Sequence, residues 1–126
     1  MEIKLKLNEV LNINRTLAAI IDDSHAKINV LLKFRLLGLM KAIEAHVSNF
    51  EFIKNEKIVE YGEKNKDGTF QISKDDIKAV AKFKKDIEQV LNSDVTICVA
   101  PFKPDEIFDK GLKSEYLSGL YPIIRE

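Results

Sequence analysis

The most constraining feature of this sequence is a stretch without a helix breaker that extends from about Ala26 to Tyr61. It contains no proline, and its one glycine, Gly38, costs a helix only about 1 kcal/mol. Apolar residues recur along it at spacings of three or four, at Ile28, Leu32, Leu36, Leu39, Ile43, Val47 and Phe50. This periodicity predicts one continuous helix with an apolar stripe, about 50 Å long.

The first half of this predicted helix is apolar on more than one side. Five apolar residues lie off the stripe, namely Val30, Leu31, Phe34, Leu37 and Met40. A helix that is apolar almost all round must be covered on several sides, either by the rest of its own chain or by a second chain. If a second chain covers it, we predict that these five residues form the contact surface, with self-association as the first candidate.

Three other segments alternate apolar and polar residues, which is typical of half-buried strands. They are Glu2–Leu7, Thr69–Ser73 and Val95–Ala100. Together with the helical segments, they predict an α+β fold: a long central helix with helical partners packed on a small, mostly antiparallel three-stranded sheet. No repeat, low-complexity tract or linker interrupts the chain, so residues 1–126 are expected to form a single domain.

Shorter helices are expected between and after these strands. Asn8 is predicted to cap a helix that reaches about Asp22 and buries Leu11, Leu17, Ile20 and Ile21. Residues 73–76 are expected to cap another, with an inward face of Ile77, Val80, Phe83, Ile87, Val90 and Leu91. Gly62 is expected to end the long helix in the left-handed conformation. Pro104 and Ser114 each mark the start of a short helix, the last stopped by Pro122.

The charge balance and the single cysteine bound the class of protein. Twenty basic and twenty acidic residues cancel, which disfavours a nucleic-acid partner. Cys98 is alone, so an intramolecular disulfide is impossible and a reducing compartment is expected. No apolar stretch reaches the roughly 18 residues of a membrane span, and residues 1–7 lack a signal-peptide core. These features predict a cytoplasmic protein without a membrane partner.

One loop resembles a calcium-binding site. Residues 63–71 alternate oxygen-bearing side chains before and after Gly68, as in an EF-hand. The twelfth position, which must supply a bidentate carboxylate, is Lys74. We therefore favour the other interpretation, in which Asp67–Gly68 forms a turn that leads into a strand, and we expect no metal or other cofactor.

No set of residues has the spacing of a known catalytic motif. Cys98 would need a base to act as a nucleophile, and the two histidines, His25 and His46, lie at unrelated positions. The acidic pairs 22–23, 75–76 and 105–106 fall at expected helix starts, where carboxylates interact favourably with the helix dipole. We therefore predict no catalytic residue and no enzyme activity.

Several segments carry a resemblance to a known family. They are residues 49–63, residues 66–72, residues 95–99, and the C-terminal Leu117, Leu120, Tyr121 and Pro122 before Ile123 and Ile124. Together these segments resemble a family of small proteins of unknown function encoded by bacteriophages and prophages of Gram-positive bacteria. The resemblance implies a phage origin and action in the bacterial host cytoplasm.

Three functional hypotheses follow. The first is a non-enzymatic phage protein that acts through protein–protein contacts in virion assembly or as an accessory factor, as a homo-oligomer or with another phage or host protein. The alternative is an inhibitor of host antiviral defence that sequesters a host protein or a signalling nucleotide. A nucleotide would require basic groups such as Lys33, Arg35 or Arg125 beside an aromatic ring. The third is an enzyme built on Cys98, which would require an activated thiol.

Overall fold

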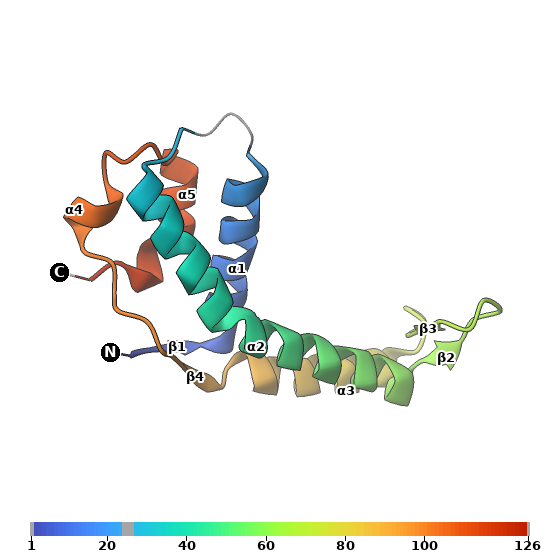
Figure 1. Ribbon diagram of the computed structural model, residues 1–126. Helices are drawn as coiled ribbons and strands as arrows, with labels where there is room; N and C mark the ends of the chain where they lie inside the picture. Colours follow the sequence, from blue (N-terminus) through green and yellow to red (C-terminus); the bar gives the residue numbers. More distant parts are fainter. Residues whose placement is uncertain (1, 24–26, 126) are drawn as a thin grey trace. The chain divides into compact units, whose positions relative to one another are not determined.

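The computed structural model describes residues 2–23 and 27–125, which are mostly helical (Figure 1). In chain order the elements are β1 (Ile3–Lys6), α1 (Leu7–Asp22), α2 (Val30–Tyr61), β2 (Glu63–Lys64), β3 (Phe70–Gln71), α3 (Ile77–Leu91), β4 (Asp94–Ile97), α4 (Pro104–Ile107), α5 (Ser114–Leu120) and the 3-10 turn η1 (Tyr121–Ile123). The chain forms two compact units. Unit 1 combines Met1–Val47 with Asp94–Glu126, and unit 2 is Ser48–Ser93, so α2 contributes to both. The single domain predicted from the sequence stays a prediction.

The long helix predicted from the sequence is confirmed, with a later start than expected. Asn29 caps α2, because its side-chain oxygen accepts the backbone N–H of Leu31 at 3.0 Å and of Leu32 at 3.2 Å. The predicted apolar stripe is indeed the face turned inward. Its buried members are Leu32, Leu36, Leu39, Ile43 and Phe50, and its half-buried members are Ile28 and Val47.

The predicted three-stranded sheet is replaced by two separate two-stranded sheets. In unit 1, β1 pairs antiparallel with β4, with Ile3 opposite Ile97 and Leu5 opposite Val95. In unit 2, β3 pairs antiparallel with β2 and does not join β1 and β4. The reason is local: Gly68, at a φ of 92°, closes a tight turn that folds β3 back onto the residues just before it.

The core of unit 1 begins with the alternating apolar residues of β1. Ile3, Leu5 and Leu7 are buried as predicted, and the same face continues into α1 without a break. α1 therefore begins at Leu7 and not after Asn8, and the Glu9 carboxylate accepts the Lys6 backbone N–H at 3.0 Å. Its buried residues are Leu7, Val10, Ile13, Leu17 and Ile20. The predicted burial of Ile21 is wrong, and Leu11 is only half-buried.

In unit 1, α1 and α5 pack so closely that one of their contact positions is a glycine. α1 packs against α5 (Figure 1), and Gly119 lies where an added Cβ would be 2.1 Å from the Thr16 hydroxyl oxygen. The C-terminal segment is tied down by Phe102, whose N–H donates to Ile123 at 2.9 Å and whose carbonyl accepts from Arg125 at 2.8 Å. Pro122 lies inside η1 and does not stop α5 directly.

Unit 2 contains the second half of α2 (residues 48–61), the β2–β3 hairpin and α3. Asp76 caps α3, since its carboxylate accepts the Ala79 N–H at 3.1 Å. Tyr61 donates its hydroxyl proton to Asp86 at 2.5 Å and so links the two helices. Ile77 is 79% exposed, which corrects its predicted inward position. It is the first residue of α3, on the opposite side of that helix from the buried Ala79.

Gly62 ends α2 for a reason other than the one predicted. It does not adopt a positive φ, unlike Gly68 and Gly111. Its N–H donates to the Ile58 carbonyl at 2.8 Å, and an added Cβ would lie 2.8 Å from the backbone oxygen of Gln71 in β3. Gly62 is required here by the close contact of two backbones.

Candidate functional site

The predicted contact residues lie on the first half of α2 (residues 30–47), and four of the five are exposed. The exposed fractions are 76% for Val30, 73% for Leu31, 75% for Phe34 and 45% for Leu37. Met40 is half-buried. At about 100° per residue, Val30, Phe34 and Leu37 are centred on the face opposite the buried stripe, and Leu31 flanks them. We call these four exposed residues the α2 apolar face.

The start of α2 is fixed by backbone contacts with the C-terminal segment of unit 1. The Asn29 N–H donates to the Lys110 carbonyl at 2.9 Å. Gly111, at a φ of 95°, lies so close to Lys27 that an added Cβ would be 2.2 Å from its carbonyl oxygen. The first turn of α2 is therefore held in place, and Val30 and Leu31 project from a fixed position.

Arg35 lies on the first half of α2, between the buried stripe and the α2 apolar face. Its guanidinium forms an ion pair with Glu106, donates to the Ala100 carbonyl at 3.0 Å and lies 3.9 Å from the centre of the Phe102 ring. The Lys103 backbone N–H also donates to Glu106, at 3.0 Å. This hydrogen bond, together with the charge of Arg35, lowers the pKa of Glu106.

A small hollow of about 270 Å³ adjoins the α2 apolar face at Leu31. Its lining is mixed in charge: Asn29, Leu31, Leu32, Arg35, Asp105, Glu106 and Lys110. Lys33 and Lys41 lie on or beside the α2 apolar face and are exposed, and Lys27 is exposed in the segment before α2. The α2 apolar face is thus an apolar patch beside charged side chains, which suits contact with another chain.

The loop that resembles an EF-hand is a hairpin turn. Asp67 accepts hydrogen bonds from the Thr69 hydroxyl at 2.7 Å and the Thr69 N–H at 3.0 Å, and these bonds lower its pKa. The Gly68 N–H donates to the Asn65 carbonyl at 3.1 Å. The Asp–Gly turn favoured from the sequence is confirmed. Within residues 2–23 and 27–125, no three His, Cys, Asp or Glu side chains gather as metal ligands would.

Among the described residues, no hydrogen bond joins the candidate nucleophile Cys98 to His46. Cys98 is exposed just after β4. His46 places its Nε2 3.1 Å from the backbone oxygen of Thr96, so this nitrogen is engaged with the main chain. His25 lies outside the described residues.

Two of the three acidic pairs lie where the sequence predicted. Asp76 and Glu106 act at the starts of α3 and α4. Residues 22–23 do not, because they end α1. There Asp23 pairs with Lys113 at 2.9 Å and accepts the Tyr116 hydroxyl at 3.1 Å, so it links α1 to α5.

Comparison of the chain with protein-family models, curated proteins and solved structures gives no match. Among the described residues, none of the helices combines the length and the apolar character that crossing a bilayer requires.

Sequence reasoning identified the α2 apolar face but missed the cluster around Arg35. Arg35 and Glu106 are separated by 71 positions, and no local pattern connects them. The one signal was the acidic pair at Asp105–Glu106, which was assigned only to the helix dipole. Its second function, as the partner of an arginine on α2, requires knowledge of the fold.

Proposed function

We propose that this protein acts by binding another protein chain through the α2 apolar face and that it catalyses no reaction. This proposal is supported chiefly by the exposure of Val30, Leu31 and Phe34 on a helix whose opposite face is already buried. Monomers rarely expose contiguous apolar patches without a functional reason. The fixed start of α2 supports a binding role further, because a preorganised surface loses little entropy when it binds.

A second copy of the chain is the first proposed occupant. An exposed helix face that pairs with itself around a twofold axis is the commonest way to close such a surface. The lysines around the patch oppose this pairing at low salt, and their repulsion is screened as salt rises. We therefore expect self-association to strengthen from low to physiological salt.

We further propose that this contact serves a bacteriophage, in virion assembly or as an accessory factor in the host cytoplasm. The support is the sequence resemblance to small phage and prophage proteins given above. The α2 apolar face would then join copies of the protein, or join it to another phage or host protein.

The test measures molar mass by light scattering and sedimentation over a range of concentrations. We expect the wild-type chain to dimerise and Phe34→Ser to be monomeric. The matched control is Phe52→Ser, because Phe52 is also an exposed phenylalanine of α2, at 68% against 75%, but lies in unit 2. A wild-type chain that stays monomeric at every concentration refutes self-association, as does an equal effect of the two variants.

The alternative, capture of a signalling nucleotide, has less support. Arg35 does lie on an aromatic ring, but its charge is paired with Glu106 and the Phe102 ring is fully buried, so no base could stack on it. Arg125 lines a hollow with Glu2, Ile3, Lys4 and Pro101, without an aromatic side chain. We expect no thermal stabilisation by cyclic nucleotides; a shift of several degrees would revive this alternative.

A further inference from the structure

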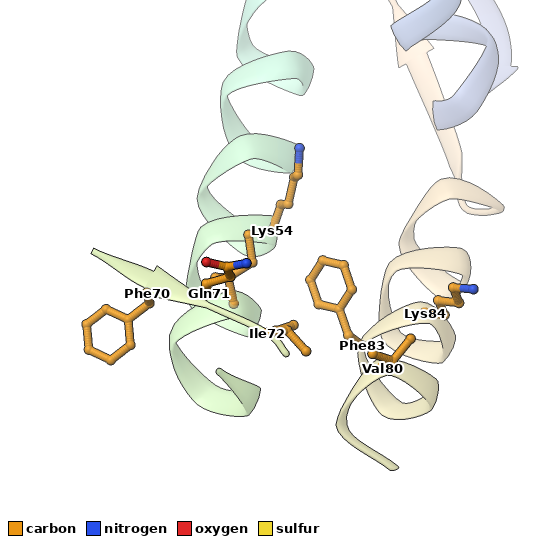
Figure 2. A pocket seen from close by; sticks show the side chains of 8 residues that line it. Lys54, Phe70, Gln71, Ile72, Val80, Phe83 and Lys84 are labelled. Atoms are coloured by element: carbon orange, nitrogen blue, oxygen red, sulfur yellow. The ribbon is translucent and has the colours of Figure 1, made fainter. Parts of the chain in front are cut away.

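Unit 2 contains an apolar groove separate from the α2 apolar face. It lies between the second half of α2, β3 and α3, and its volume is about 350 Å³. The lining residues are Lys54, Ile58, Phe70, Ile72, Val80 and Phe83, with Gln71 and Lys84 at the margin. Figure 2 shows Ile72 and Phe83 close together between the two helices, whereas the Phe70 ring is turned away from them on the other side of the α2 ribbon in this view.

Two lysines give this groove a positive margin. Lys54 projects from α2 and Lys84 from α3 (Figure 2). Within the part of the chain that the structure describes, neither forms an ion pair. Lys57, one turn along α2 from Lys54, is different: it pairs with Glu60 at 2.7 Å and with Asp86 at 3.7 Å. Among the described residues, Lys54 and Lys84 thus leave two unpaired positive charges beside the groove.

Unit 2 has few buried apolar side chains. Among the described residues, eighteen apolar side chains are buried, and only two of them, Phe50 and Ala79, belong to unit 2. Ile58, Ile72 and Phe83 are only half-buried. A polypeptide unit of fewer than roughly 60 residues has difficulty burying enough surface alone. An occupant of the groove would convert these half-buried side chains into a core.

We propose that this groove binds a polypeptide segment of a partner protein in which apolar side chains are flanked by acidic ones. The apolar floor takes the apolar side chains, and Lys54 and Lys84 attract the carboxylates. The groove is open to solvent along its length, whereas a small ligand needs a site that encloses most of its surface.

The probe is a short fluorescein-labelled peptide with a leucine and phenylalanine core between glutamate-rich flanks, measured by fluorescence anisotropy on the full-length chain. Its counterpart carries lysine in place of every glutamate. We expect the glutamate peptide to bind, to protect α3 and β3 from hydrogen exchange, and to weaken as salt rises. Lys84→Glu should weaken binding roughly fivefold or more, because attraction becomes repulsion.

The matched control for charge is Lys82→Glu, since Lys82 is an exposed lysine of the same helix that does not line the groove. The control for apolar contact compares Phe70→Ser, in the groove, with Phe52→Ser, outside it. The four substituted side chains are exposed, namely Lys82, Lys84, Phe52 and Phe70. The variants are therefore expected to keep the fold, and circular dichroism checks this.

Three results would overturn the proposal: no binding of the glutamate peptide to the folded chain, equal binding of the lysine peptide, or equal loss in Lys82→Glu and Lys84→Glu. Protection of the groove by decanoate but not by the peptide would also overturn it, because the site would then take a small amphipathic acid. None of these results bears on self-association through the α2 apolar face, so failure of one proposal leaves the other standing.

Discussion

Unit 1 and unit 2 share one helix but are stabilised in different ways. In unit 1, the first half of α2 buries Leu32, Leu36, Leu39 and Ile43 almost completely. In unit 2, the second half of α2 is joined to α3 by polar contacts as well, through Tyr61 and Lys57 to Asp86. Surface ion pairs contribute little to stability compared with a buried leucine. Because unit 1 holds most of the buried apolar side chains, we expect it to supply most of the folding free energy.

The largest effect is expected from truncating the core of unit 1. Leu39→Ala should lower the free energy of unfolding by about 2–5 kcal/mol, because the side chain is fully buried and leaves a cavity. Ile58→Ala, at a half-buried position of unit 2, should cost only about 1 kcal/mol. Urea denaturation of both variants tests the comparison. Equal costs would show that unit 2 is as tightly packed as unit 1.

A second test uses two glycines. Gly119→Ala should destabilise unit 1 by about 1–3 kcal/mol, since the new methyl group would overlap Thr16. Gly38→Ala meets no atom within 4 Å and lies in the middle of α2, so it should stabilise the chain by up to about 1 kcal/mol. Thermal unfolding at low protein concentration measures both. A Gly119→Ala variant as stable as the wild type would contradict the close packing of α1 against α5.

The third test asks whether unit 2 opens separately. Asp76→Ala removes the cap of α3 and should cost about 1 kcal/mol, whereas Asp75→Ala, next to it, should cost little, because no hydrogen bond to the Asp75 carboxylate holds the first turn of α3. Hydrogen exchange is expected to rise in α3 of Asp76→Ala while α1 and α5 stay protected. A uniform rise through the whole chain would show that the two units unfold together.

The smallest effect concerns pH. In unit 1 the pKa of Glu106 is lowered by the Lys103 N–H and by Arg35, and the pKa of Asp94 is lowered chiefly by Lys6. A lowered folded-state pKa means that the stabilisation is complete above the unfolded-state value and is lost as pH falls through the folded-state value. Stability should therefore decline on acidification, and less so in Glu106→Gln. Carboxyl resonances followed by NMR check the direction of each pKa.

The sequence predicted the parts of the fold that depend on local periodicity. The buried stripe of α2 and the alternation of Ile3, Leu5 and Leu7 were identified correctly, because one side of each element faces the interior. The inward face of α1 was partly wrong: Val10 and Ile13 continue the face begun by Leu7, but placing the cap at Asn8 hid that continuity.

Pairings between distant segments could not be predicted in the same way. Thr69–Ser73 alternates like the other strands, yet its partner is Glu63–Lys64, two charged residues without any strand pattern. The surplus apolar residues of α2 were visible in the sequence, but the sequence left open whether the rest of the chain covers them. The groove of unit 2 was not predicted, since Val80 and Phe83 were expected to be covered and a sequence does not show how completely a neighbour covers them.

The absence of a side chain at Gly62 also determines how wide the groove of unit 2 is. The main chain of Gln71 lies against the end of α2 only because no methyl group separates them, and β3 forms one wall of the groove. A methyl group at this position would lie 2.4 Å from the Ile58 carbonyl oxygen and 2.8 Å from that of Gln71, so either the end of α2 or this wall would have to move. The width of the groove thus depends on a residue that does not line it.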